Sequence, residues 1–191
     1  MLIMTRIIAG LAGSLKLTSP AKVTRPTSDR IRESIFSRLE AKELIDGAKV
    51  LDLYAGTGAL ALESASRGAA AAWMVERDGK AAAVCVANLK IVAKALLKEE
   101  VEFDGKVINK SVSSFLASPG EVVFDLVFID PPYEITNDEI VSELELLKPL
   151  LKDATVVVER SSRTEAPNWP DGYVLEDEKS YGDTLVYWLS A

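Results

Sequence analysis

Four consecutive residues of the chain, Asp130-Pro131-Pro132-Tyr133, could do chemistry on an amino nitrogen. They directly follow the apolar run 124–129, which predicts a buried strand. A diproline turn is rigid, so it would hold a carboxylate, a backbone carbonyl and an aromatic ring in one small volume. Two acceptors and a stacking surface suit a flat base that carries an NH2 group. We therefore predict Asp130, Pro131 and Tyr133 as catalytic residues, with a purely structural turn as the alternative.

A glycine turn, Gly56-Thr57-Gly58, follows a second apolar strand that contains Asp52. Glycine lets a ligand approach the backbone closely, and the helix expected next offers unpaired N–H groups at its N-terminus. Glu76 ends the following predicted strand, where a carboxylate can accept hydrogen bonds from ribose hydroxyls. The pattern predicts a nucleotide-type cofactor site. The same pattern also fits the fingerprint of dinucleotide-binding proteins. It is therefore compatible with a methyltransferase, with a nicotinamide enzyme and with a turn that binds no ligand.

The composition excludes much common catalytic chemistry. The chain has no histidine and one cysteine, Cys85. A Ser-His-Asp triad, a Cys-His pair, a histidine-ligated zinc and an intrachain disulfide are therefore impossible. No metal site is predicted, and Cys85 is expected to be a small buried helix residue. Methyl transfer from a sulfonium donor remains possible, because in-line displacement depends on proximity, orientation and electrostatics and needs no histidine base.

The elements that must position these motifs are expected to form one α/β domain. At 191 residues, with 48% hydrophobic and 27% charged residues, the chain can bury a substantial core. Apolar strands alternate with helical stretches, as a doubly wound, mostly parallel sheet requires. After an N-terminal hairpin, the predicted strands are 49–54, 72–76, 105–109, 124–129, 154–159, 173–176 and 184–189, the last two joined through 179–183. The predicted helices are 28–39, 59–67, 79–98, 112–117 and 137–151.

Charge is distributed unevenly along the chain. The net charge is −7, yet residues 1–40 contain seven basic and three acidic residues, whereas the remainder contains 15 basic and 26 acidic residues. We predict that 1–40 is a basic extension that docks nucleic-acid phosphates and that 41–191 is the catalytic core of the same domain. An ordinary solvated helix face is the alternative. The candidate phosphate contacts are Arg6, Arg25, Arg30 and Arg32.

The chain carries no sign of a membrane segment. Its apolar stretches fall short of the roughly 18 residues that span a bilayer. Together with the single cysteine, this predicts a cytoplasmic protein. No apolar stripe is left over for a partner subunit, so a monomer is expected.

Four blocks of sequence resemble the RsmD-type 16S rRNA guanine-N2 methyltransferases, and the resemblance covers nearly the whole chain. The first block comprises 6–10 and the arginine-rich segment 25–36, and the second comprises 51–60 with 66–69. The third is the Asp-Pro-Pro-Tyr motif, and the fourth is Tyr181-Gly182-Asp183-Thr184. The first and last blocks are specific to the family, whereas the middle two are shared with many amino methyltransferases.

The resemblance implies a class I methyltransferase fold with a seven-stranded Rossmann-like sheet and S-adenosylmethionine as cofactor. It also implies methyl transfer to the exocyclic N2 of a guanine in 16S rRNA, within the small ribosomal subunit. The implied catalytic contacts are hydrogen bonds from the amine to Asp130 and to the Pro131 carbonyl, with Tyr133 stacked on the base. Many relatives have an acidic residue where this chain has Ser111, which puts one adenine contact in doubt. The implied cofactor-binding residues are Asp52, Gly56, Thr57, Gly58, Glu76 and Ser111.

Three other functions stay open at this point. An amino methyltransferase acting on DNA adenine N6 or on a protein glutamine would share the Asp-Pro-Pro-Tyr motif, but would leave the arginine-rich N-terminal segment without a role. An NAD-dependent oxidoreductase would use the same glycine loop and leave Asp-Pro-Pro-Tyr unexplained. A non-catalytic scaffold would bind RNA without turnover.

Overall fold

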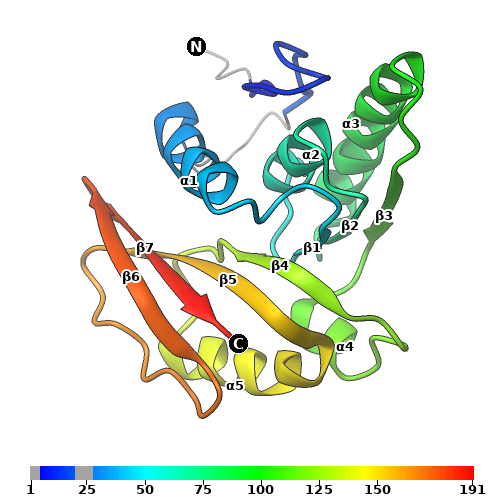
Figure 1. Ribbon diagram of the computed structural model, residues 1–191. Coiled ribbons are helices and arrows are strands. Elements are labelled where there is room, and N and C mark those ends of the chain that lie inside the picture. The colour runs from blue at the N-terminus through cyan, green and yellow to red at the C-terminus, as the bar shows by residue number, and fades with distance from the viewer. Residues whose placement is uncertain (1–4, 20–27) are drawn as a thin grey trace.

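A seven-stranded sheet forms the centre of the molecule (Figure 1). The computed structural model describes residues 5–19 and 28–191. In the order β3-β2-β1-β4-β5-β7-β6, the first five strands are parallel, and β7 pairs antiparallel with both β5 and β6. This arrangement confirms the predicted Rossmann-like, mostly parallel sheet. The strands are β1 (Lys49–Asp52), β2 (Ala71–Val75), β3 (Asp104–Ile108), β4 (Phe124–Ile129), β5 (Leu151–Ser161), β6 (Val174–Tyr181) and β7 (Thr184–Ser190).

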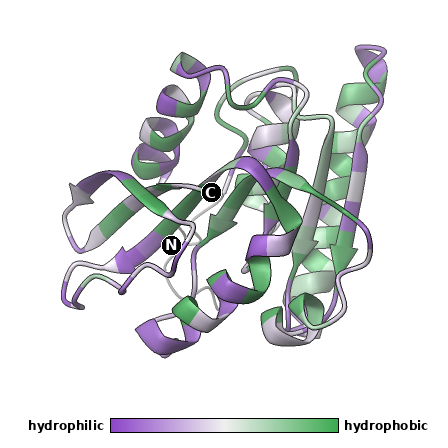
Figure 2. Ribbon diagram, turned by 60° about the horizontal axis from the view of Figure 1, so that its bottom comes forward, coloured by the Kyte–Doolittle hydropathy of each residue, from purple (hydrophilic) through white to green (hydrophobic). Residues whose placement is uncertain are grey.

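Helices cover both faces of the sheet, and each face buries its own apolar cluster. Successive strand residues alternate between the two clusters, so Phe128 faces the first and Ile129 the second. Figure 2 shows hydrophobic residues concentrated in the central strands and hydrophilic residues on the outer turns of the helices. The first face carries α1 (Asp29–Ala41), α2 (Ala59–Ser66) and α3 (Gly79–Lys98), and the second carries α4 (Val112–Leu116) and α5 (Asn137–Leu147).

One predicted helix ends earlier than expected. The pattern over 137–151 predicts a single helix, but α5 stops at Leu147 and a 3₁₀ turn, Lys148–Leu150, follows. The reason is Pro149, which has no N–H to donate to the next helical hydrogen bond, although Lys148 before it still has helical geometry. Strand β5 therefore begins at Leu151 and is longer than the predicted 154–159.

The C-terminal hairpin is also longer than predicted. Strand β6 continues through Tyr181, so the connection to β7 is the two-residue turn Gly182-Asp183 instead of 179–183. Gly182 has φ +61, the left-handed geometry that short hairpin turns require. The sequence hides this strand because it lies at the sheet edge, where exposed polar residues replace the apolar alternation. The predicted N-terminal hairpin is reduced to one antiparallel bridge between Arg6 and Lys16.

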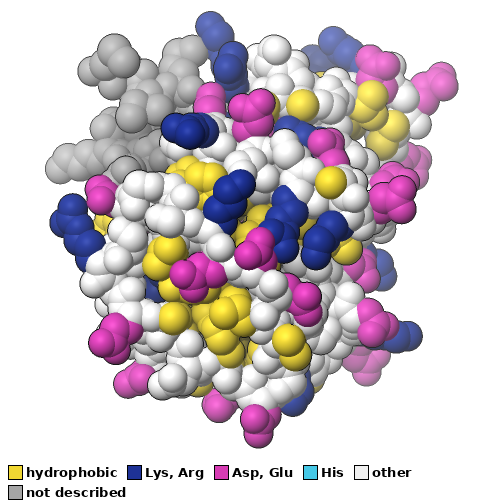
Figure 3. Space-filling model, turned by 60° about the vertical axis from the view of Figure 1, so that its left-hand side comes forward, with side chains coloured by type: hydrophobic (Ala, Val, Ile, Leu, Met, Phe, Trp, Pro, Cys, Tyr) yellow, Lys and Arg dark blue, Asp and Glu magenta, His cyan; other side chains and the backbone are white. Residues whose placement is uncertain are grey.

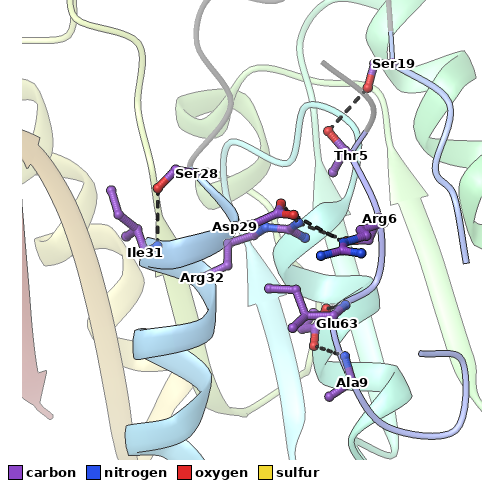
Figure 4. A network of polar contacts seen from close by, with 10 residues as sticks. Thr5, Arg6, Ala9, Ser19, Ser28, Asp29, Ile31, Arg32 and Glu63 are labelled. Carbon is purple, nitrogen blue, oxygen red and sulfur yellow. Dashed lines mark hydrogen bonds and ion pairs between the residues drawn. The ribbon is translucent and has the colours of Figure 1, made fainter. Parts of the chain in front are cut away.

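The described part of residues 1–40 packs into the main core. Ile7 and Leu17 are buried in the same cluster as Ile35 of α1. Beneath this segment lies Glu63 of α2, whose fully buried carboxylate accepts hydrogen bonds from the N–H groups of Ile8 at 2.6 Å and Ala9 at 3.0 Å (Figure 4). The predicted extension is thus anchored on the helix that follows the glycine loop.

Two further predictions concern Cys85 and membrane-spanning helices. Cys85 is fully buried on α3 with its sulfur 3.6 Å from that of Met74, which confirms it as a core residue. Within residues 5–19 and 28–191, no helix combines the length and apolar character needed to cross a bilayer.

The strand order reverses between β1 and β4. In open parallel sheets, helices leave to opposite faces at such a point and a crevice opens at the carboxyl ends of the strands. Asp52 ends β1 and Asp130 directly follows β4, so both carboxylates lie at this crevice.

Candidate active site

A cleft of about 1210 Å³ opens at the carboxyl ends of β1, β4 and β5. Ligand sites commonly measure about 300–1000 Å³, so this cleft has room for a nucleotide-sized ligand and more. The glycine loop and the Asp-Pro-Pro-Tyr motif form one part of its wall, and the first turn of α1 and the tip of the β6–β7 hairpin form another. Segments far apart in the sequence therefore meet at one site.

The two glycines of the loop have different roles. Gly56 has φ +53, and a Cβ built there would meet no heavy atom within 4 Å, so open space borders the backbone. Gly58 has φ +79, and its Cβ would lie 2.8 Å from Cys85 Sγ and 3.1 Å from Met74 Sδ. Gly56 can thus admit a ligand against the backbone. On its Cβ side Gly58 faces the core, so the absence of a side chain lets the loop pack on α3 and β2; Gly58 is not among the residues that line the cleft.

Two carboxylates flank the loop. Glu76 accepts hydrogen bonds from the N–H of Gly56 at 2.9 Å and from the N–H of Asp78 at 2.7 Å. Asp52 is 1% exposed, and among the described residues its Oδ1 finds no hydrogen-bond donor. A buried acceptor without a donor is costly. The Asp52 oxygen therefore favours a ligand that brings an N–H group.

The ionisation of Asp52 depends on its neighbours. Burial and, to a lesser extent, the negative charges of Asp130 and Glu76 raise the pKa of Asp52 to about 7, although hydrogen bonds from the backbone N–H groups of Ala61 and Tyr54 act in the opposite direction. A cation bound beside Asp52 would favour the ionised form. Binding of a cationic ligand would therefore release a proton below about pH 7.

The Asp-Pro-Pro-Tyr motif forms a wall of the cleft. Asp130 is half-buried, and Pro131 is buried beside it. Tyr133 is 64% exposed, which excludes a role as a core aromatic. Its ring is available to stack on a planar ligand.

Arg160 of β5 holds the segment that follows this motif. Its Nη2 donates hydrogen bonds to the Ile135 carbonyl at 2.8 Å and to Asn137 Oδ1 at 3.0 Å. The Asn137 side chain in turn donates to the Glu165 carbonyl at 2.9 Å. The buried side chain of Arg160 on β5 thus fixes the loop between β4 and α5.

The glycine loop is also tied to α5. The Tyr54 hydroxyl lies 2.7 Å and 2.8 Å from the two carboxylate oxygens of Glu143 and donates to this carboxylate. Burial and this hydrogen bond raise the pKa of Tyr54, and burial also raises the pKa of Glu143. The pair therefore holds Tyr54 as a neutral donor beside the cleft.

The sequence of this chain is similar to those of known proteins. The family model described as Conserved hypothetical protein 95 matches residues 5–190. The chain belongs to this family. It is 36% identical over 179 residues to Ribosomal RNA small subunit methyltransferase D of Escherichia coli (strain K12), which covers 93% of this chain and 85% of that protein.

Two further similar proteins support the same family assignment. The protein of the same name from Haemophilus influenzae is 32% identical over 179 residues, covering 93% of this chain and 89% of that protein. The solved structure of the Escherichia coli protein yhhF has a TM-score of 0.82 at 33% identity and covers 98% of this chain and 97% of that one. These matches confirm the resemblance to the RsmD-type family and the fold that it implies.

In this member of the family, the cleft brings most predicted site residues together. Ser111 is an exception, because it is exposed and caps α4 by accepting a hydrogen bond from the Ser114 N–H at 3.2 Å. Its neighbour Val112 lines the cleft instead, so the structure gives no support for a contact of Ser111 with adenine. The predicted residues that line the cleft are Asp52, Gly56, Thr57, Glu76, Asp130, Pro131, Tyr133, Arg30 and Arg32.

The four predicted RNA-binding arginines differ in their surroundings. Arg30 is exposed, and the Arg6 side chain is 59% exposed with Nε 3.3 Å from Asp29 Oδ2. The Arg32 side chain is only 1% exposed; it donates to Asp29 Oδ1 at 2.7 Å and to the Arg6 carbonyl at 2.9 Å (Figure 4). Its predicted phosphate contact is therefore revised: Arg32 lies on the buried face of α1 and ties this helix to the N-terminal segment. Arg25 lies outside the described residues.

The sequence predictions omitted two residues at the end of β5. Glu159 and Arg160 are both buried and both line the cleft. Their sequence position could have identified them as candidate site residues, because they follow an apolar run at the carboxyl end of a strand, as Asp130 does. Tyr181 belongs to the fourth family block; its hydroxyl hydrogen-bonds Ser34 Oγ and joins the hairpin tip to α1.

Proposed function

We propose that this protein transfers the methyl group of S-adenosylmethionine to the exocyclic N2 of a guanine in 16S rRNA, within the small ribosomal subunit. The observation that carries the proposal is that the Asp-Pro-Pro-Tyr motif and the Gly56 loop open into one cleft. Two relatives named Ribosomal RNA small subunit methyltransferase D support the substrate class. The proposal includes a monomeric enzyme in the cytoplasm.

The residues around the glycine loop suit this cofactor. The open space beside Gly56 would take its methionine part, and Asp52 Oδ1 would accept a hydrogen bond from its ammonium group. Glu76 would accept hydrogen bonds from its ribose hydroxyls. When bound, the cofactor supplies an electrophilic methyl group on a sulfonium.

Asp130 and Pro131 would prepare the nucleophile. The guanine amine is weakly nucleophilic, because its lone pair is delocalised into the ring. When the Asp130 carboxylate and the Pro131 carbonyl accept its two N–H groups, the nitrogen becomes pyramidal and its lone pair can be directed at the methyl carbon. As the N–C bond forms and the C–S bond breaks, Asp130 takes the proton that the nitrogen loses.

Tyr133 would hold the target base. The base must leave its own stack to reach Asp130, and an exposed aromatic ring at the cleft can replace that stacking. Stacking of a base on an aromatic side chain is worth about 1–3 kcal/mol.

Basic side chains around the cleft support RNA as the substrate. Arg30, Arg77 and Lys80 line the cleft, and the side chain of Arg163, in the turn after β5, is 80% exposed. Figure 3 shows the side of the molecule that carries α1 and the β6–β7 hairpin, where lysine and arginine side chains lie across the middle among scattered carboxylates. Such residues would contact phosphates, and Arg25 belongs to the same proposal.

The alternatives account for fewer observations. A methyltransferase for DNA adenine or protein glutamine would use the same cleft, but two relatives of this chain are named as ribosomal RNA methyltransferases. A nicotinamide enzyme would leave Asp130 and Tyr133 without a role.

The test is transfer of labelled methyl from S-adenosylmethionine to small ribosomal subunits that lack the modification, followed by nucleoside analysis. N2-methylguanosine should form with the wild type and disappear with Asp130→Ala, whose cofactor affinity should stay within a few-fold of normal. Lack of incorporation into subunits and free RNA, with cofactor binding intact, would refute the rRNA assignment.

A further inference from the structure

Asp130 can bind an amino group, but it does not by itself distinguish guanine from adenine or cytosine, which also carry one. We propose that Glu159 makes this distinction by accepting a hydrogen bond from the guanine N1–H. The inference rests on the proposed function and adds a base-recognition residue to it.

The strand register places Glu159 beside Asp130. In the parallel pair β4–β5, Phe128 is opposite Val157 and Ile129 is opposite Val158. The next residue is Asp130, which directly follows β4, and on β5 it is Glu159. Adjacent strands are about 4.8 Å apart, so side chains at these positions can meet one edge of the same base.

Both carboxylates also leave the sheet on the same face. Phe128 and Val157 belong to the apolar cluster under α1 and α2, and the residues two positions later return to that face. Glu159 is 5% exposed and lines the cleft together with Asp130. The following residue, Arg160, also lines the cleft, but its guanidinium is engaged with the Ile135 carbonyl in the loop before α5. The cleft side therefore presents two adjacent carboxylates.

The neighbours of the amino group differ among the bases. In guanine, the ring nitrogen N1 next to the amine carries a hydrogen and is a donor. In adenine and cytosine, the ring nitrogen next to the amine is an acceptor. A carboxylate beside Asp130 would attract the guanine edge and repel the lone pair of the other two. Because a carboxylate can accept about four hydrogen bonds, other contacts of Glu159 are compatible with this one.

The test compares two bases at the methylated position. Small subunits are reconstituted with 16S rRNA that carries either guanine or 2,6-diaminopurine there; the latter keeps the N2 amine but has an acceptor at N1. Single-turnover transfer by the wild type should favour guanine by about 10- to 100-fold, because a hydrogen bond to a charged group is lost with the analogue. Equal rates on the two bases would overturn the proposal without any variant.

The variant Glu159→Gln identifies the residue responsible. A carboxamide can accept from guanine N1–H or donate to diaminopurine N1, so the preference for guanine should fall at least tenfold. Glu159→Asp keeps the charge and should keep the preference at a lower rate. Glu178→Gln, on the exposed edge strand β6, is the matched control and should leave the preference unchanged.

The outcomes separate this inference from the proposed function. A preference reduced in Glu159→Gln alone, with unchanged cofactor affinity, supports the assignment. If Glu159→Gln slows both bases equally and the preference persists, Glu159 does not read N1 and the inference is wrong, while guanine methylation stands. If the wild type forms no N2-methylguanosine on any RNA, the proposed function fails and this inference fails with it.

Discussion

The side-chain amide of Asn88 donates a hydrogen bond to the carbonyl oxygen of Thr57 at 2.9 Å. The same amide donates to the Thr18 carbonyl at 2.9 Å, and its Oδ1 accepts from the Thr18 N–H at 2.8 Å. Asn88 is fully buried on α3. One side chain thus connects the glycine loop with the N-terminal segment that precedes α1.

Asn88→Ala should weaken both elements. It leaves three backbone groups without their partner, so we expect a loss of about 2–4 kcal/mol in the free energy of unfolding and roughly tenfold weaker cofactor binding. Chemical denaturation and calorimetric titration measure the two effects. Lys90→Ala, at an exposed position of the same helix, is the control. Unchanged cofactor affinity in a destabilised Asn88→Ala would show that the loop does not need this contact.

Cofactor affinity should rise with pH between about pH 5.5 and 7.5. Burial and nearby charges raise the pKa of Asp52 to about 7 in the free protein, so below this pH a proton must leave before the carboxylate can pair with an ammonium group. The same raised pKa means that ionisation of Asp52 destabilises the free fold as pH rises from about 4 to 7. Asp52→Asn should bind more weakly and lose the pH dependence. An unaltered profile in this variant would assign the titration to another group.

Tyr133→Ala should impair binding of RNA more than folding. The ring is 64% exposed, so its removal should leave the melting temperature nearly unchanged. Loss of stacking should raise the KM for RNA about 5- to 100-fold. Tyr133→Phe retains the ring and should behave like the wild type. A comparable defect in Tyr133→Phe would point to the hydroxyl instead of stacking.

Arg160→Lys should lower turnover without weakening cofactor binding. Lysine keeps the charge but has no planar fork to bridge the Ile135 carbonyl and Asn137 Oδ1, so the loop after Tyr133 should shift. A small misplacement of catalytic groups costs about 10- to 100-fold in kcat. Steady-state kinetics on subunits and a direct binding measurement distinguish the two effects. An equal loss in cofactor affinity would contradict a role limited to this loop.

Arg30→Ala should affect RNA binding and not folding, whereas Arg32→Ala should affect the stability of the fold. The exposed Arg30 should contribute a phosphate contact, so its removal should reduce the salt dependence of RNA affinity by about 0.7–0.9 in the log–log slope. The buried Arg32 binds Asp29 and the Arg6 carbonyl, so its removal should reduce the free energy of unfolding by about 1–3 kcal/mol. An unchanged salt slope for Arg30→Ala would remove Arg30 from the RNA-binding surface.

The sequence was sufficient to predict the sheet and the position of the glycine loop and the Asp-Pro-Pro-Tyr motif at its edge, because these features depend on short-range patterns. The apolar runs before Asp52 and Asp130 predict strands, and parallel strands bring their carboxyl ends together at one edge. Local patterns do not indicate what a residue faces in three dimensions. Gly58 and Gly56 look equivalent in sequence, yet one packs on Cys85 and the other borders the cleft.

Burial of charged residues was the harder problem. Arg32 was predicted to contact phosphates, a role that requires an exposed side chain, and charged residues are usually exposed. It shares the inner face of α1 with Ile35 and Phe36 and is covered by contacts that come from the N-terminal segment. Glu159 was not predicted, because its significance depends on the neighbouring strand, a relationship that appears only once the register is known.

The order of strands has a consequence for when the enzyme can first act. Strand β7 follows β6 in the chain but lies between β5 and β6 in the sheet, so β6 has no place there until residues 184–190 have been synthesised. Only then can Tyr181 reach Ser34 and complete the wall of the cleft. A nascent chain that already contains Asp52 and Asp130 therefore still lacks a complete cleft, and its activity should begin only after the last strand has entered the sheet.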